Sequence, residues 1–303
     1  MDKFAALNAF TTVVEEEGFA PAARRMGTTR STVNRMVIAL EDDWGVQLLN
    51  RTTRRVAPTA SGKALYERAR RLLDDLAETE AGVRDSHSEP VGDLRLNAPM
   101  SFGTMHLSPA IADFMALHPN IRVSLTLNDR MVDIVDEGYD LTIRIAEPQE
   151  DVDMVDHRIV AIKRVLCASP DYIAAKGAPG HPQDLQTMSC LHYGNLPTGN
   201  SWRLEGPDGT VAVRVNGAMC TNNGEVVCDA AVRGLGIALL PTFIVGQELQ
   251  SGRLVTILPD YPPSTLTLCA IYPPSRHLST KIRLFTDFLI ERFGERPYWD
   301  LVG

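Results

Sequence analysis

The sequence predicts a helical N-terminal segment followed by an α/β region, with a short polar linker between them. Up to about residue 87, apolar side chains recur at helical spacing. From residue 94 onward, short apolar runs alternate with helical patterns, and this order indicates βαβ crossovers and a mostly parallel sheet. Between the two parts, residues 86–93 (SHSEPVGD) combine serine, proline and glycine, which is typical of a linker.

The composition is that of an ordinary globular protein. The 303 residues are 44% hydrophobic and 22% charged, which excludes fibrous, disulfide-rich and fully disordered chains. The longest apolar stretch, residues 236–246, is well short of the roughly 18 residues that a membrane span needs. Met1-Asp2-Lys3 does not resemble the start of a secretory signal. We therefore expect a cytoplasmic protein with no membrane partner and with reduced thiols at Cys167, Cys190, Cys220, Cys228 and Cys269.

Charge is distributed unevenly along the chain. The net charge of −8 argues by itself against a nucleic-acid partner. Between Arg24 and Arg71, however, eleven Lys and Arg stand against four acidic residues, so this segment carries +7 and the remainder −15. A small basic module on an acidic body is typical of a protein whose module meets phosphate.

Three helices are expected before residue 45. The first has one apolar stripe at helical period, made of Phe4, Leu7, Phe10, Val13 and Val14. The second is short, from Pro21 to Met26, and Gly27 is its expected C-cap. The third has Thr28 or Thr29 as its N-cap, and its core stripe consists of Val33, Val37, Leu40 and Trp44.

A basic hairpin and a long helix are expected next. Residues 48–58 (LLNRTTRRVAP) place arginines and threonines between apolar residues, which suits an exposed hairpin better than a helix. Thr59 can cap a helix that runs to about His87. A heptad seam on this helix predicts pairing with a second chain, through Leu65, Ala69, Leu72, Leu76 and Val83.

The elements of the α/β region follow from its apolar runs. Strands are expected at residues 94–98, 121–127, 141–145, 164–168, 237–240 and 266–272. Helices are expected at residues 107–117, 225–233 and 281–293.

Helix, turn, helix and basic hairpin in this order indicate a DNA-binding module, because a helix-turn-helix places its second helix in the major groove. A helical packing unit without DNA would not explain why positive charge gathers on one exposed face. The expected contacts from the third helix are Arg30, Ser31, Thr32, Asn34 and Arg35. The expected contacts from the hairpin are Arg51, Thr53, Arg54 and Arg55.

Residues 10–62 closely resemble the winged helix-turn-helix of LysR-type transcriptional regulators. The resemblance rests on Ala22-Ala23-Arg24-Arg25-Met26-Gly27, Leu48-Leu49-Asn50-Arg51 and Thr59-Ala60-Ser61-Gly62. This chain departs from the family pattern at Arg30, Asn34, Trp44 and Pro58. Since Asn can bind adenine and Arg can bind guanine, the first two departures suggest base preferences of its own.

The resemblance covers nearly all 303 residues and implies an α/β fold class in three parts. An N-terminal all-α winged helix-turn-helix would occupy residues 1–58, and a linker and dimerisation helix with its hinge residues 59–90. A two-lobed effector domain similar to a periplasmic binding protein would occupy residues 91–303. Lobe I would take about residues 91–162 and 266–303, and lobe II about residues 163–265.

The expected effector site lies where strands lead into helices. In open α/β sheets, ligands bind beyond the carboxyl ends of strands, against helix N-termini. The resemblance brings two such junctions, residues 101–104 and 222–224, to one cleft between the lobes. The side chains expected there favour a small, polar, anionic effector: Met100, Ser101, Phe102, Asp129, Arg144, His192 and Asn222. Three of them have an ordinary alternative: Asn222 as a helix cap, His192 as a core imidazole and Arg144 as the partner of Asp140.

Other chemistry has little support in the sequence. No nucleophile elbow, phosphate-binding loop or zinc spacing occurs, so we expect no enzyme, no cofactor and no metal. Gly234-Leu235-Gly236 lies between a helix and a strand, whereas a dinucleotide fingerprint needs the reverse order. Two alternatives stay open: a regulator that senses redox state through Cys220 and Cys228, and a small-molecule-binding protein whose DNA-binding appendage has no regulatory role.

The resemblance also implies an assembly and a mechanism. A homodimer would form through residues 59–87, and two dimers would join through their α/β domains into a homotetramer on promoter DNA. Ligand binding would close the cleft, change DNA bending and alter the access of RNA polymerase. A ligand can shift such states only by its difference in affinity for them.

Overall fold

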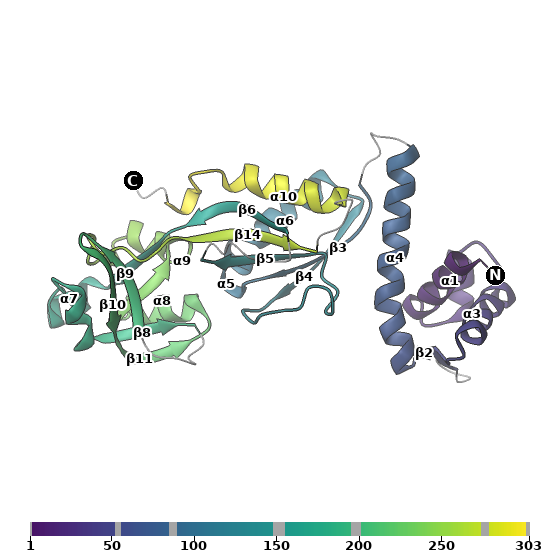
Figure 1. The fold of residues 1–303 in the computed structure, drawn as a ribbon, viewed down its shortest axis with the longest axis horizontal. Helices are drawn as coiled ribbons and strands as arrows, with labels where there is room; N and C mark the ends of the chain where they lie inside the picture. Colours follow the sequence, from purple (N-terminus) through teal and green to yellow (C-terminus); the bar gives the residue numbers. More distant parts are fainter. Residues whose placement is uncertain are drawn as a thin grey trace. The chain divides into compact units, whose positions relative to one another are not determined.

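The computed structural model describes residues 2–51, 56–84, 90–147, 155–194, 201–273 and 279–300. The chain divides into two compact units, Met1–Asp93 and Leu94–Gly303 (Figure 1). Each unit has its own hydrophobic core. The finer boundaries at residues 58 and 90, and those of the two lobes, stay predictions.

The first unit has the expected order of helices and hairpin. Its elements are α1 (Lys3–Glu15), α2 (Phe19–Arg25), α3 (Arg30–Trp44), β1 (Leu49–Arg51), β2 (Val56–Pro58) and α4 (Ala60–Arg84). The Thr29 side chain accepts the Thr32 N–H at 3.2 Å and caps α3, which decides between the two predicted caps. Gly45 ends α3 in the left-handed conformation, with φ of 64°. Helix α2 begins earlier than Pro21 because Gly18 is its N-cap.

Apolar stripes of the helices form the core of the first unit. Most of the predicted residues are fully buried, with 0% exposure for Phe10, Val13, Val33, Val37 and Leu40. The prediction is wrong for Phe4 and Trp44, which are 49% and 43% exposed. Each lies in a terminal turn of its helix, past the turns that pack against neighbouring helices.

The hairpin closes against the start of α4. Strands β1 and β2 are antiparallel, with Leu49 opposite Pro58, which confirms the predicted hairpin. The Thr59 hydroxyl accepts the Gly62 N–H at 3.0 Å and donates to the Gln47 carbonyl at 2.8 Å. A Cβ atom on Gly62 would lie 2.1 Å from the Leu48 carbonyl oxygen, so only glycine allows this approach.

Helix α4 divides its apolar side chains between two faces. Ala69 is fully buried in the core of the first unit, and Leu65 and Leu73 pack against that core. Leu72 is 53% exposed. The predicted seam is therefore wrong as a single interface, because Leu65 and Ala69 pack in the core of the first unit whereas Leu72 is exposed. The side chain of Val83 lies outside the described residues.

The second unit contains two five-stranded sheets and a separate hairpin. The first sheet has the order β4-β3-β5-β14-β6, from β3 (Gly92–Ala98), β4 (Ile121–Leu127), β5 (Leu141–Ala146), β6 (Val155–Ile162) and β14 (Leu266–Tyr272). Its helices are α5 (Met100–Phe102), the π-helix η1 (Gly103–Leu107), α6 (Ser108–Leu117) and α10 (Thr280–Phe293). The expected helix at residues 107–117 thus continues a helical run that begins at Met100.

The second sheet has the order β11-β8-β12-β7-β13. Its strands are β7 (Arg164–Ala168), β8 (Ser189–Tyr193), β11 (Asn216–Thr221), β12 (Ile237–Pro241) and β13 (Val255–Thr256). Strands β9 (Ser201–Gly206) and β10 (Gly209–Arg214) form the separate hairpin. The remaining helices are α7 (Pro170–Lys176), η2 (Pro182–Gln186), α8 (Gly224–Val232), α9 (Thr242–Gln250) and η3 (Tyr298–Asp300).

Both sheets are mixed, so the prediction of mostly parallel pairing is wrong. Strand β3 is parallel to β5, and β8 is parallel to β11 and β12. Strand β14 is antiparallel to β5 and β6, and β7 is antiparallel to β12 and β13. The antiparallel pairs arise because the chain leaves the first sheet after β6, enters the second with β7 and returns with β14 (Figure 1).

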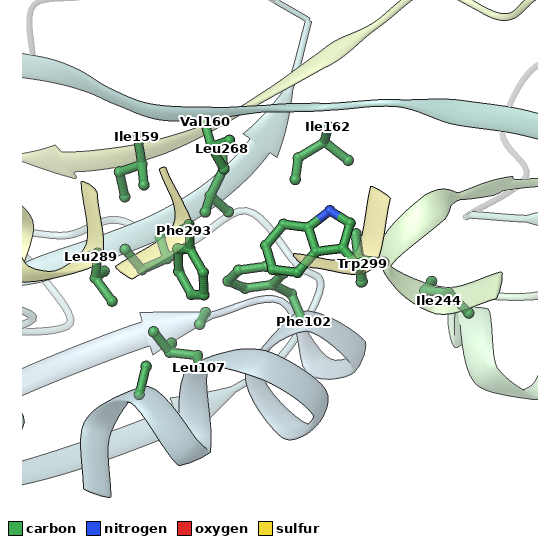
Figure 2. Close-up of a cluster of buried hydrophobic side chains, with 14 of the residues drawn as sticks. Phe102, Leu107, Ile159, Val160, Ile162, Ile244, Leu268, Leu289, Phe293 and Trp299 are labelled. Atoms are coloured by element: carbon green, nitrogen blue, oxygen red, sulfur yellow. The ribbon is translucent and has the colours of Figure 1, made fainter. Parts of the chain in front are cut away.

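An aromatic cluster connects the start of the helical run to the end of the chain. In Figure 2, the rings of Phe102, Phe293 and Trp299 lie together between the strands that carry Val160 and Leu268 and the helix below. Ring centroids of Phe102 lie 5.6 Å from Phe293 and 5.9 Å from Trp299. This packing fixes Phe102, and with it the position of the neighbouring Ser101.

Candidate DNA-binding and effector sites

The N-terminal turn of α3 presents a polar face opposite its buried stripe. Val33 and Val37 are fully buried, whereas Arg30, Ser31 and Arg35 are exposed. Because residues 3 and 4 apart share one helix face, burying the valines turns Ser31 and Arg35 outward. Arg30 lies on the side of Val33 and Val37 and is exposed as the first residue of the helix. Exposed side chains at the start of the second helix of a helix-turn-helix are the ones that reach base edges.

Local hydrogen bonds order the hydroxyls at the start of α3. The Thr29 Oγ1 atom lies 2.9 Å from both Ser31 Oγ and Thr32 Oγ1. Asn34 is half-buried on the next turn. All five residues that the sequence predicts on this helix therefore lie in its first two turns.

Not every basic side chain of the first unit is free to meet DNA. Arg25 pairs with Glu15 at 2.7 Å, and Arg70 of α4 pairs with the same carboxylate. Arg30 and Arg35 have no such ion pair among the residues that the structure describes. Of the predicted hairpin contacts, Thr53, Arg54 and Arg55 lie outside the described residues, as does the side chain of Arg51.

Glu41 of α3 holds the first strand of the hairpin. Its Oε1 atom accepts the N–H groups of Leu48 at 2.8 Å and Leu49 at 3.1 Å. One carboxylate thus fixes the spacing between the predicted recognition helix and the wing. The sequence gives no local signal for this role, because Glu41 resembles any other acidic residue on a helix surface.

In the second unit, three polar residues from different elements lie close together. Ser101, in the first turn of α5, is only 1% exposed, and its hydroxyl has no hydrogen-bond partner of proper geometry. Asp129, just after β4, accepts the Met100 N–H through Oδ1 at 3.0 Å. Its other oxygen, Oδ2, is buried without a partner among the described residues. The Tyr193 phenol, at the end of β8, lies beside the Ser101 hydroxyl.

Burial and charge perturb the Tyr193 phenol. Burial above all, and then the charge of Asp129 and Glu225, raises its pKa to about 12, while the Ser101 hydroxyl acts in the opposite direction. A Cβ atom on Gly224 would lie 3.4 Å from Cζ of Tyr193, so the ring packs on the start of α8. The sequence analysis missed Tyr193, although it follows the predicted His192 directly in the same strand.

Asn223, rather than Asn222, caps α8. Its side chain accepts the Val226 N–H at 3.0 Å, and its Nδ2 lies 3.6 Å from Met100 Sδ. Asn222 is exposed, so the alternative that it serves as the helix cap is wrong. The contact with Met100 joins the α8 junction to the α5 junction.

Other predicted residues have different surroundings. Phe102 is fully buried in the aromatic cluster, so its predicted contact with an effector has no support. The Arg144 guanidinium contacts Met131 Sδ, while the carboxylate of Asp140 accepts the Arg95 N–H at 2.8 Å. Arg144 is thus held by the loop after β4 rather than by Asp140.

Buried polar atoms without partners are concentrated near these junctions. Five of the seven such atoms in the described residues are Ser101 Oγ, Asn128 Oδ1, Asp129 Oδ2, Thr142 Oγ1 and His192 Nδ1, and the other two are Glu248 Oε2 and Trp299 Nε1. Burial lowers the pKa of His192, whose imidazole is not the satisfied core group that the alternative required. Since buried polar groups nearly always have partners, these atoms need water or a ligand to complete their hydrogen bonds.

A cavity elsewhere in the second unit has satisfied polar groups. It encloses about 450 Å³ and is lined by residues of β7, α9 and β13 together with Lys163 and Asp300. The Asp300 carboxylate binds Lys163 at 3.1 Å and the Thr242 hydroxyl at 2.6 Å. The polar groups that line this cavity therefore need fewer hydrogen bonds from a ligand than those near Ser101 do.

The thiols do not support a redox switch. Cys228 is buried, and burial above all raises its pKa to about 12, so it stays protonated at neutral pH. Cys220 is exposed, and its thiol lies 3.4 Å from the Gly194 carbonyl. The described part of the chain also holds no group of His, Cys, Asp and Glu that could bind a metal, and no helix long and apolar enough to cross a membrane.

A helix-turn-helix with an exposed basic face, joined to an α/β domain with unsatisfied polar groups, defines a DNA-binding regulator. The protein families that this chain matches agree with its classification as a DNA-binding regulator. Residues 4–63 match the model of the bacterial regulatory helix-turn-helix protein of the lysR family, and residues 87–294 match the LysR substrate binding domain. The chain belongs to the LysR family of transcriptional regulators.

Relatives with names and structures lie within this family. The chain is 34% identical to the transcriptional regulator DmlR of Escherichia coli, over 95% of this chain and 94% of that protein. It is 33% identical to the transcriptional activator TtdR of Escherichia coli, over 93% and 91%. The full-length virulence activator AphB of Vibrio cholerae has a TM-score of 0.60 at 29% identity, covering 95% of this chain and 98% of its own. CrgA of Neisseria meningitidis has a TM-score of 0.62 at 28% identity, covering 96% of this chain and 99% of its own.

Membership in the family confirms the fold class and the resemblance, apart from the correction to sheet pairing. These relatives are transcription regulators and not enzymes.

Proposed function

We propose that this regulator binds its operator through the first two turns of α3 and responds to a small effector bound near Ser101. Arg30, Asn34 and Arg35 are the proposed base contacts, and Arg54 and Arg55 the proposed phosphate contacts of the wing. Bidentate contacts from Asn and Arg each contribute about 1–3 kcal/mol of discrimination between bases. A regulator has to reach the promoter DNA of the chromosome that it binds, so we propose a cytoplasmic location for this protein.

One observation carries the DNA-binding part of the proposal. Helix α3 has a stripe with 0% exposure on one side; Arg35 is exposed on the opposite side, and Arg30 is exposed at the N-terminus of the helix. These arginines stand at the start of the second helix of a helix-turn-helix, the position that enters the major groove in this motif.

The effector part rests on the buried polar atoms near Ser101 and Asp129. A ligand that supplies the missing hydrogen bonds stabilises the arrangement in which they converge. By linkage it shifts the protein toward whichever DNA-binding state has that arrangement.

We propose a homodimer formed by the exposed side of α4, around Leu72 and Leu76, with two dimers joining into a homotetramer. The half-sites of the operator then follow the symmetry of the dimer. Effector binding changes the placement of the DNA-binding pairs and so the access of RNA polymerase to the promoter.

The test is a gel-shift assay of the full chain with the intergenic DNA upstream of its own gene, against DNA of equal length and shuffled sequence. The expected result is a specific complex that survives excess shuffled competitor. Complexes that the competitor removes equally from both DNAs would contradict sequence-specific binding.

A further inference from the structure

The charges of two carboxylates act on the Tyr193 phenol at the centre of the proposed effector site. Asp129 reaches it from the end of β4 and Glu225 from the first turn of α8. Both lie near enough to the Tyr193 phenol for their charge to act on it, and among the described residues no cation offsets them there. Arg144, the one cation predicted for the site, is not among the groups whose charge acts on Tyr193, and its guanidinium contacts Met131 Sδ. The local field is therefore negative, which opposes a ligand that is only an anion.

Asp129 has one oxygen used and one left over. The Met100 N–H occupies Oδ1 at 3.0 Å. Oδ2 is buried and accepts no hydrogen bond from any described residue. An ionised carboxylate oxygen can only accept, so the group that completes it must be a donor.

Two hydroxyls beside this carboxylate can meet an acceptor. Ser101 is 1% exposed, and apart from the neighbouring Tyr193 phenol its hydroxyl has no partner among the described residues. The Tyr193 phenol stays protonated at neutral pH because its pKa is raised to about 12. The site thus presents donors and a free acceptor side by side, from α5, β8 and the loop after β4.

We propose that the effector is a carboxylate with a hydrogen-bond donor on the adjacent carbon, that is, a 2-amino or 2-hydroxy acid. The ligand carboxylate accepts from Ser101 and Tyr193, and the donor binds Asp129 Oδ2. This inference rests on the proposed function, in which this region is the effector site.

Such a site discriminates strongly against analogues that lack the donor. A plain carboxylate would leave the Asp129 oxygen buried and unpaired, which weakens its binding by at least about tenfold. An ammonium gains more than a hydroxyl here, since two carboxylates lie nearby.

Calorimetric titration of the full chain with three matched series tests the inference. Each series keeps the carbon skeleton and changes only the group at carbon 2: propionate, lactate and alanine; glutarate, 2-hydroxyglutarate and glutamate; phenylpropionate, phenyllactate and phenylalanine. We expect the amino or hydroxy member of at least one series to bind at least about tenfold tighter than its parent. The order of the two donor-bearing members tells whether the ligand is an amino acid or a hydroxy acid.

Variants assign the preference to its residue. Asp129→Asn keeps the acceptor for the Met100 N–H and removes the free carboxylate oxygen. The donor-bearing acid and its parent acid should then bind about equally tightly. Asp136→Asn, an exposed carboxylate in the same loop, is the matched control and should keep the preference. Ser101→Ala should weaken every member of a series by a similar factor, since it meets the shared carboxylate.

Different failures are separable. If the parent acids bind as tightly as their donor-bearing partners, the inference is overturned while the effector site stands. A preference that survives Asp129→Asn overturns the role of Asp129. If no member of any series binds, the proposed carboxylate effector fails together with the inference.

Discussion

The carboxylate of Glu41 accepts the backbone N–H of Leu48 at 2.8 Å, and this contact joins the predicted recognition helix to the wing. The same oxygen accepts the Leu49 N–H at 3.1 Å. Both the helix and the hairpin are expected to touch DNA, so their spacing has to match that of the duplex surfaces they meet. A single side chain thus sets the distance between the two elements proposed to contact DNA.

Glu41→Ala should weaken operator binding and lower the stability of the first unit, because two backbone donors lose their acceptor. The cost is about 1.5–3 kcal/mol for hydrogen bonds to a charged group. Glu41→Gln keeps an acceptor oxygen and should recover most of the loss. Thermal unfolding and DNA anisotropy measure the two effects. Equal affinity in wild type and Glu41→Ala would show that the wing does not depend on this contact.

Arg35→Ala and Asn34→Ala should each weaken operator binding by about 1–3 kcal/mol and leave the fold intact. Arg35 is exposed and Asn34 half-buried, and neither belongs to the buried stripe of α3. Anisotropy with wild-type and base-substituted operators measures the loss. Arg203→Ala, an exposed arginine of the other unit, is the control for charge alone. Unchanged affinity and base preference in both variants would remove α3 from the groove.

Leu72→Glu should reduce the oligomeric state, because Leu72 is a large apolar side chain left 53% exposed on α4. A carboxylate placed in a paired apolar interface lacks a partner and is costly, whereas on a monomer it stays in water. Sedimentation velocity measures the change. Ala77→Glu, at another exposed position on α4, should leave the oligomer intact. Identical sedimentation of wild type and Leu72→Glu would place the interface elsewhere.

Stability should fall below neutral pH because of His106. Its Nε2 lies 3.0 Å from the Phe243 carbonyl and its Nδ1 lies 2.5 Å from the Tyr298 hydroxyl, so the neutral ring donates to the first and accepts from the second. Burial lowers the pKa of His106 in the folded state. Below the unfolded value of about 6.5, the unfolded chain then binds more protons, and stability is lost as the pH falls; above it the contribution is complete.

Melting temperatures measured between about pH 7.5 and about pH 5.5 check this expectation. His106→Gln should flatten the pH dependence. His118→Gln, at the end of α6, serves as the control for replacing another histidine of the same unit. A wild-type melting temperature that rises toward acidic pH would contradict the sign argued here.

Much of the first unit could be predicted from the sequence because its signals are local. The apolar period of α3, the Thr29 cap and the Gly45 stop each lie within a few residues of the feature they specify. The exposure of Phe4 and Trp44 could not be predicted from local signals, because burial at a helix end depends on which neighbouring elements of the fold extend that far.

The strand pairing of the α/β unit was harder to predict, because it depends on segments that are far apart in the sequence. Strand β14 joins β5 and β6 across more than a hundred residues, and no local pattern tells whether that pairing is parallel. Of the residues of the proposed effector site, the sequence analysis named Ser101 and Asp129 but not Tyr193 and Asn223. Which of two adjacent asparagines caps α8 is settled by backbone geometry rather than by residue type.

Sequence-specific DNA binding through α3 is the central claim, and anisotropy of the full chain on its own upstream DNA tests it most directly. Titrations with that DNA and with a shuffled duplex, at one salt concentration, give the specificity ratio. We expect the upstream DNA to bind on the order of a thousandfold or more tighter, and Arg35→Ala to reduce this ratio by about tenfold or more. Equal affinity of wild type for the two duplexes, or a ratio that Arg35→Ala leaves unchanged, would contradict the assignment of α3 as the helix that reads the operator.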